Sequence, residues 1–136
     1  MRIGDSDPAQ SAEAAAIGAD HGVDEINLNV GCPSSRVASG TFGACLMREP
    51  RLVGDCIAAM KAKVEIPATI KCHMGVDEQD PETALGQMGE HVLAAGCDRL
   101  IVHALREPCA NSPRKSLSTF AEFARALSAR TESFKR

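Results

Sequence analysis

The sequence predicts an α/β fold in which the strands of a parallel sheet alternate with helices. Two patterns carry this prediction: an acidic residue followed by Pro begins each of three helix signals, and a short apolar strand signal follows each helix. The length of 136 residues is a third observation, since a complete eight-stranded α/β barrel typically needs ~250 residues. The order (β)αβαβαβ calls for a parallel sheet with right-handed crossovers, and its roughly four βα units look like units of such a barrel.

Each expected helix begins at a Pro, because the first helical position tolerates Pro and the preceding acidic side chain complements the helix N-terminus. Gly22 and Gly96 end the first and the third helix. The expected ranges are residues 8–21, 50–62 and 81–95. The second and third helices carry apolar residues at helical spacing, and we expect these to pack on the core: Leu52, Val53, Cys56, Ile57 and Met60, and Leu85, Met88, Val92 and Ala95.

Strands are expected at residues 25–30, 66–71 and 99–103, and residues 1–3 are expected to be the end of a preceding strand. Successive strand residues point to opposite faces, and each strand ends in a polar residue on one of them: Asn29, Lys71 and His103. Parallel strands bring their carboxyl ends to one edge, where α/β folds bind ligands. We therefore expect these side chains in register at a site there. Polar residues also mark strand ends in general, and this alternative stays open.

The composition excludes several classes of protein. An apolar share of 44% and a charged share of 24% are typical of a folded chain rather than a disordered one. The absence of Trp and Tyr argues against an aromatic platform for single-stranded nucleic acid. No apolar run approaches the ~18 residues of a membrane span, and the N-terminus has no apolar signal core. We expect a cytoplasmic protein without a membrane partner.

The six cysteines have no C-x-x-C spacing, which argues against a zinc site, and no metal is expected. In the reducing cytoplasm we expect no disulfides. Four cysteines are expected to be structural: Cys56, Cys72, Cys97 and Cys109.

Residues 106–136 differ in charge from the rest of the chain. They hold seven Lys and Arg against three Asp and Glu, a net +4, so residues 1–105 carry a net −7. A basic segment can favour nucleic acid, and a solvated terminus is the alternative. A helix is expected near residues 117–130.

A Gly-Cys-Pro turn follows the first full strand. Gly31 permits the turn and Pro33 stiffens it, so that Cys32 is held on a loop beside the polar strand ends. A thiol at this position can act as a nucleophile or as a proton donor, and a nearby Lys or His would shift its pKa. From these residues alone a structural role for Cys32 remains open.

The segment around Cys32 resembles the signature of a known family. Asn-x-Gly-Cys-Pro-Ser-x-x-Val over residues 29–37, followed by Gly-x-Phe-Gly-Ala-Cys-Leu-Met over residues 40–47, is similar to the tRNA-dihydrouridine synthases, and most to their A-type (20/20a) branch. The resemblance covers about residues 1–104 and includes further segments: Gly4-x-Ser6-Asp7-Pro8, Asp24 to Val30, Pro67-x-Thr69-x-Lys71, Gly75-Val76-Asp77, Ala95-Gly96-Cys97 and Ile101 to Ala104.

This resemblance implies a partial (β/α)8 barrel of the TIM type. Residues 1–104 would form part of an FMN-binding barrel, and residues 105–136 would be a basic tail without a counterpart in the family. The implied activity is reduction of a uridine in the tRNA D-loop to dihydrouridine. NADPH reduces FMN, and the reduced flavin transfers hydride to a uridine flipped out of the tRNA.

The resemblance also implies roles for particular residues. Cys32 would be the general acid that protonates the uracil ring, and Lys71 and His103 would contact FMN. Asn29 would lie at both the flavin and the uracil, and Arg36 would lie near the tRNA. Three of them have a simpler alternative: Lys71 as a lysine that reaches solvent, His103 as an ordinary histidine and Arg36 as a surface arginine. Cys45 belongs to the motif but is not expected to be catalytic.

The chain departs from the family pattern at two positions, Arg2 in place of a Gln and His73 in place of an Arg. The phosphate site of such barrels lies after strands 7 and 8, which four βα units do not provide. A partial barrel also has open sheet edges, which favour self-association. We expect the isolated chain to be inactive as a monomer. A truncated half barrel without activity, or an oligomerising module, is the alternative to an enzyme.

Overall fold

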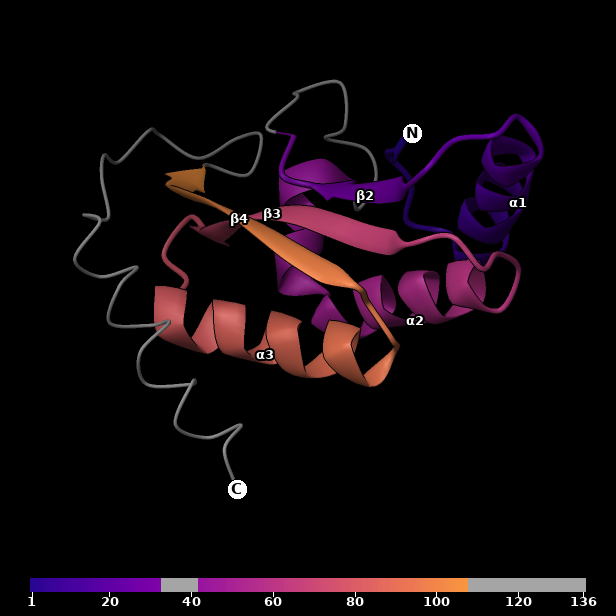
Figure 1. Cartoon of the computed structure of the whole chain (residues 1–136). Helices are drawn as coiled ribbons and strands as arrows, with labels where there is room; N and C mark the ends of the chain where they lie inside the picture. Colours follow the sequence, from indigo (N-terminus) through magenta and orange to yellow (C-terminus); the bar gives the residue numbers. More distant parts are fainter. Residues whose placement is uncertain (33–41, 108–136) are drawn as a thin grey trace.

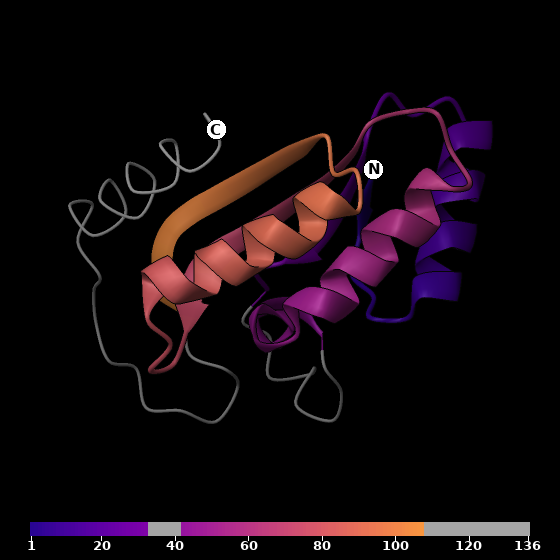
Figure 2. The same cartoon turned by 90° about the horizontal axis from the view of Figure 1, so that it is seen from below.

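A computed structural model describes residues 1–32 and 42–107 of the chain (Figure 1). Within these ranges the strands form a four-stranded parallel sheet in the order β1-β2-β3-β4, which confirms the predicted α/β class. Seen from below, the helices lie side by side on one face of the sheet (Figure 2). The elements are β1 (Arg2–Ile3), α1 (Pro8–Asp20), β2 (Ile26–Val30), the 3-10 helix η2 (Gly43–Arg48), α2 (Pro50–Lys61), β3 (Ala68–Val76), α3 (Pro81–Ala94) and β4 (Arg99–Glu107).

The α-helices begin at the three predicted prolines and end within a residue of the predicted positions. At α1 the Asp7 carboxylate accepts the Gln10 N–H at 2.9 Å. At α3 the Asp80 carboxylate accepts the Thr83 N–H at 2.8 Å. An Asp cap of this kind stabilises a helix by about 1 kcal/mol. The Asp-Pro pairs therefore set the starts of α1 and α3 through their own side chains.

Strands β3 and β4 are longer than expected, and the predicted ends at residues 71 and 103 are wrong. The pairing of β3 with β4 continues through an irregularity between His73 and Gly75, after which Gly75 pairs with Arg106. Met74 and Val76 are fully buried, and their burial favours continuing the strand. Lys71 therefore lies in the middle of β3 rather than at its end.

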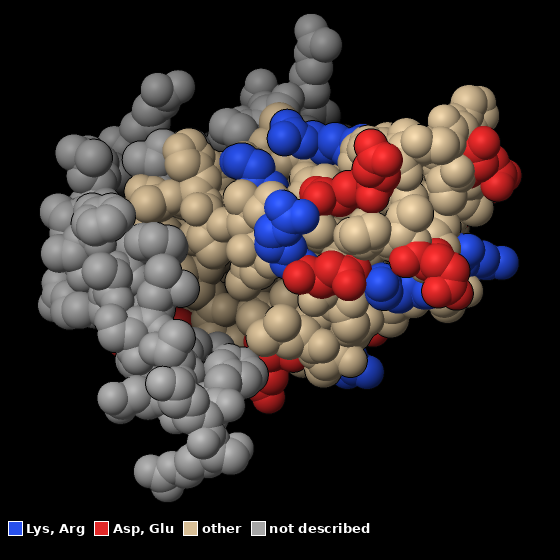
Figure 3. All heavy atoms as spheres, viewed as in Figure 1, with Lys and Arg blue, Asp and Glu red and all other residues tan. Residues whose placement is uncertain are grey.

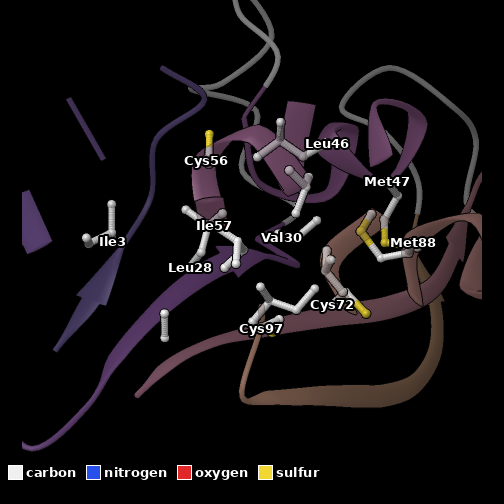
Figure 4. Packing of buried hydrophobic residues seen from close by; sticks show 14 of the residues in the cluster. Ile3, Leu28, Val30, Leu46, Met47, Cys56, Ile57, Cys72, Met88 and Cys97 are labelled. Carbon is white, nitrogen blue, oxygen red and sulfur yellow. The ribbon is translucent and has the colours of Figure 1, made fainter. Parts of the chain in front are cut away.

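The core lies between the apolar face of the sheet and the helices (Figure 4). In β2 the alternation is complete, with Ile26, Leu28 and Val30 buried and the two asparagines half-buried. The apolar faces predicted for α2 and α3 are buried except at Leu52 and Ala95, which are partly buried. The prediction of core-facing helices is confirmed.

The buried cysteines behave as apolar residues, as predicted for Cys56, Cys72 and Cys97. Burial raises the pKa of the Cys56 and Cys97 thiols, and it raises the pKa of Cys72 to about 12. These thiols stay protonated near neutral pH. Cys45 is disulfide-bonded, so the expectation that no disulfide forms is wrong at this position.

The described surface mixes charges of both signs. On the face shown in Figure 3, Lys and Arg side chains lie beside Asp and Glu side chains and do not gather into one basic area. Two of the exposed pairs are Lys61–Asp98 and Arg99–Glu25, at 3.0 and 2.9 Å. Among the described residues no helix is both long and apolar enough to cross a membrane.

Candidate functional site

The predicted polar residues lie on the sheet face opposite the helices, but not all at one level. Asn29 pairs with Lys71 across β2 and β3, and Lys71 pairs with Ile101 of β4. His103 lies two residues beyond Ile101 on β4 and pairs with His73 of β3. The expectation that His103 is in register with Asn29 and Lys71 is therefore wrong. The reason is that β4 begins with Arg99 opposite Thr69, which places Ile101 beside Lys71.

Asn29 connects the sheet to the Cys32 loop. Its side-chain oxygen accepts the Gly31 N–H at 3.3 Å, a local contact typical of Asn at the start of a turn. The oxygen is thereby engaged with the backbone, and the NH2 group is the part of the amide that can donate to a ligand. Asn29 and its neighbour Lys71 are both half-buried. Two hydrogen-bond donors therefore stand together at the base of this loop.

The second half of the cysteine motif packs against the first. Cys32 is exposed and is a free thiol. Its carbonyl oxygen accepts the Ala44 N–H at 3.0 Å. Gly43 has φ +56°, and a Cβ there would lie 2.4 Å from the same oxygen. The motif thus needs Gly at this position, because only Gly combines a positive φ with so close an approach.

Sequence reasoning missed the part that His73 plays at this site and noted it only as a departure from the family. The His73 ring is buried, and its Nε2 atom lies 2.7 Å from the Gly31 carbonyl oxygen. The ring centroid is 5.1 Å from that of His103, with the two planes tilted by 43°. One signal could have revealed it: His73 shares strand parity with Thr69 and Lys71, so it faces the same side of the sheet.

The turn after β3 is fastened to η2. Gln79 accepts the Val76 N–H at 3.0 Å and donates to the Met47 carbonyl at 3.2 Å. Arg48 and Asp77 form an ion pair beside these hydrogen bonds. Ala44 of η2 also donates its N–H to the Cys32 carbonyl. The contacts that hold η2 in place therefore also support the cysteine loop.

A second polar network lies on the same sheet face, towards the amino ends of the strands. The fully buried Thr69 hydroxyl accepts the Asn27 side-chain N–H at 2.9 Å and donates to Glu25 at 2.8 Å. Arg99 donates to the other oxygen of Glu25 at 2.9 Å. These residues link β2, β3 and β4 at the end of the sheet away from Cys32. In α/β barrels this end serves stability.

Several expectations lie outside the described residues: those for Arg36, Cys109 and the helix near 117–130. Arg2 lies on β1 and pairs with Asn27. Among residues 1–32 and 42–107, no group of three His, Cys, Asp or Glu side chains could hold a metal ion.

The described site combines two chemical capacities. Lys71, Asn29 and His103 offer cationic or neutral hydrogen-bond donors along one sheet face. Cys32 offers an exposed thiol on the loop that follows β2.

Comparison with known proteins shows the family to which this chain belongs. The chain matches the family described as Dihydrouridine synthase (Dus) over residues 1–127, and it belongs to that family. Its parallel sheet and helices are thus part of a TIM-type (β/α)8 barrel, as predicted.

The chain is similar to curated proteins named tRNA-dihydrouridine(20/20a) synthase. Over 104 residues it is 53% identical to the one from Xanthomonas axonopodis pv. citri, 54% to that from Synechocystis sp. and 50% to that from Shewanella oneidensis. Each alignment covers 76% of this chain and 31% of the relative, so the chain spans about a third of the length of these proteins. The division at residues 104 and 105 stays a prediction, since the family match runs to residue 127.

Proposed function

We propose that this chain carries the cysteine loop and the flavin-facing residues of a tRNA-dihydrouridine synthase, which reduces a uridine of the tRNA D-loop with FMN and NADPH. The observation that supports this most is the contact between Asn29 and the Cys32 loop. Asn29 is level with Lys71 on the sheet, and its oxygen holds the Gly31 N–H. Asn29 therefore connects the loop that carries the thiol to the donors proposed for the flavin.

The donor set fits an FMN ring. The N1/O2 edge of the isoalloxazine gains negative charge on reduction, and positive or hydrogen-bonding groups stabilise it there. The Lys71 ammonium, the Asn29 amide and the His103 imidazole are groups of this kind. The phosphate-binding loops of such barrels follow strands 7 and 8, so the four strands described here would supply only the ring-facing side.

The chain's own residues would divide the chemistry as follows. When bound, FMN reduced by NADPH supplies the hydride that adds to C6 of the uracil. The Cys32 thiol gives its proton to C5, which completes the saturation of the C5–C6 bond and leaves a thiolate. Because Cys32 is exposed, solvent can return the proton before the next turnover. The Lys71 ammonium and the Asn29 NH2 group would orient the ring by hydrogen bonding, and the ammonium would balance its negative charge.

The substrate would be a uridine flipped out of the tRNA, since a stacked base cannot reach a site on the sheet. On the face shown in Figure 3 the charges are mixed. The proposal of tRNA contact rests on the loop around Cys32, as the family resemblance implies. We propose Arg36, which lies outside the described residues, as one of the groups that contact the tRNA. A tRNA substrate also supports a cytoplasmic location.

Titration of FMN with the purified full chain tests this proposal. We expect FMN fluorescence to change on binding, and Lys71→Met to weaken the affinity by about ten- to a hundredfold, as for loss of a charged hydrogen bond. Lys61→Met is the matched control, because Lys61 pairs with Asp98 on the helix side and should bind FMN like the unaltered chain. No FMN binding, or equal losses in both variants, would contradict the proposal.

A second candidate is a half barrel without activity that associates with itself. The described sheet ends at β1 and β4, and the helices of the described ranges lie on one of its faces. Edge strands favour pairing with a second chain. Sedimentation of the chain with and without FMN separates the two candidates. A stable oligomer that binds no FMN supports the second.

A further inference from the structure

We propose that His73 is a positioning residue that fixes the direction in which Cys32 presents its thiol. This inference rests on the proposed function for its chemical meaning, since that function makes Cys32 the proton donor. The structural part stands on contacts among β3, η2 and the loop itself.

The first contact is the hydrogen bond between His73 and Gly31. A carbonyl oxygen can only accept, so at 2.7 Å the Nε2 atom of His73 must carry the proton and donate it. The two residues are 42 positions apart in the chain. A buried side chain of β3 therefore holds the peptide that directly precedes Cys32.

The second contact is steric and acts between the same two residues. A Cβ at Gly31 would lie 2.8 Å from Cδ2 and 3.0 Å from Nε2 of His73. Gly31 thus lets the loop close on the flat imidazole ring, and the ring fills the space that a larger residue at 31 would need. Both residues are buried, so little solvent competes for this hydrogen bond.

The third contact lies on the other side of Cys32. Its own carbonyl oxygen is held by the Ala44 N–H at 3.0 Å and is closed in by Gly43. The peptide planes before and after Cys32 are therefore both anchored, one by His73 and one by η2. Two fixed planes fix φ and ψ of the residue between them. The thiol then keeps only rotation about χ1, and a few staggered positions remain.

His73 also connects this loop to the candidate flavin site. Its ring packs against that of His103 at a centroid distance of 5.1 Å, and the two residues are paired across β3 and β4. A shift of the His73 ring would displace both the Gly31 peptide and the His103 ring. His73 therefore sets the spacing between the proton donor and the residues that face the ring.

Four variants test the inference, with two readouts on the full chain. His73→Leu removes the donor, and His73→Gln keeps an amide N–H near the position of Nε2. Gly31→Ala keeps the His73 side chain, but the added methyl group clashes with the imidazole ring and displaces the loop. His21→Leu is the matched control, because the exposed His21 ring nitrogen also lies 2.8 Å from a carbonyl oxygen, that of Ile17, at the end of α1.

The first readout is hydrogen exchange of the Ala44 amide, which is protected by the Cys32 carbonyl. The second is the rate at which iodoacetamide modifies Cys32, read from the mass of the peptide that contains it. We expect His73→Leu and Gly31→Ala to raise Ala44 exchange by about five- to tenfold and to speed the modification of Cys32. His73→Gln and His21→Leu should match the unaltered chain, and exchange in β2 should stay constant in all variants.

Unchanged Ala44 exchange in both His73→Leu and Gly31→Ala would overturn the inference, and so would an equal rise of exchange throughout β2 and β3. If His73→Leu does not fold, Gly31→Ala and His73→Gln decide between these results. Neither measurement requires flavin or tRNA, so both are independent of the proposed function. A chain that shows the expected local changes but binds no FMN would therefore leave His73 as the anchor of the loop while the proposed function fails.

Discussion

Gly43 and Cys32 approach each other so closely that no side chain fits between them. A Cβ on Gly43 would lie 2.4 Å from the Cys32 carbonyl oxygen and 3.2 Å from its Cβ atom. Gly43 also has φ +56°, which an L-residue rarely adopts. The two halves of the cysteine motif are thus joined through one glycine, and the position of the thiol depends on it.

We expect Gly43→Ala to lower the free energy of unfolding by about 2–4 kcal/mol, since the added methyl group meets backbone that cannot move away cheaply. Gly22→Ala is the matched control, because Gly22 has φ +74° with nothing within 4 Å of an added Cβ. Gly22→Ala should lower the free energy of unfolding only by the cost of placing Ala at a positive φ, about 1 kcal/mol. Urea unfolding of both variants measures the difference, and equal losses would mean that the contact with Cys32 carries no energy.

Much of this fold follows from short-range signals in the sequence. The Asp-Pro pairs at residues 7–8 and 80–81 determine helix starts through contacts within three residues, and strand parity separates core from polar positions. The length of β3 was not predictable in the same way, because Gly75 looks like the start of a loop. Its pairing with Arg106 comes from a neighbouring strand. Strand parity puts His73 on the same sheet face as Lys71, but its hydrogen bond to Gly31 also depends on how β2 pairs with β3, which the sequence pattern does not contain.

The same limit applies to the candidate site. Cys32, Asn29 and Lys71 are candidates on the motif and on strand parity, and the structure places Asn29 beside Lys71. His103 could not be placed, because its level on the sheet depends on where β4 begins relative to β3. Register between strands is set by packing and turn geometry, which local patterns do not contain.

The raised pKa of Cys72 predicts a loss of stability at alkaline pH. Burial raises the pKa from the ordinary 9.0 to about 12, so the folded chain binds this proton more tightly than the unfolded chain. The contribution is complete below pH 9 and is lost as the pH rises towards 12, with a slope of up to about 1.4 kcal/mol per pH unit. Cys72→Ala should flatten the dependence measured by urea unfolding. The exposed Cys32→Ala should keep it, and parallel curves for all three chains would disprove the assignment.

The Thr69 hydroxyl should contribute to stability more than its exposed counterparts. Thr69→Val keeps the shape but removes the hydrogen bonds to Asn27 and Glu25, and we expect a loss of about 1–3 kcal/mol in the free energy of unfolding. Thr83→Val is the control, since the Thr83 hydroxyl donates to Asp80 in an exposed position and should cost well under about 1 kcal/mol. A smaller loss for Thr69→Val than for Thr83→Val would rule out the buried network as a source of stability.

Removal of the Cys32 thiol should separate chemistry from binding. Cys32→Ala deletes the proton donor but no core contact, so stability and FMN affinity should stay near those of the unaltered chain. Under conditions in which the unaltered chain forms dihydrouridine in tRNA that lacks it, Cys32→Ala should lower the rate by about 10²- to 10⁴-fold, the usual contribution of a general acid. The product is measured after digestion as a uridine that has gained two hydrogen atoms.

Cys97→Ala is the control, because its buried thiol donates to the Arg99 carbonyl at 3.3 Å and has no access to substrate. It should lower stability while leaving any dihydrouridine formation per folded chain unchanged. Equal and measurable dihydrouridine formation in Cys32→Ala and the unaltered chain would exclude Cys32 as the acid and point to another proton source at the same sheet edge.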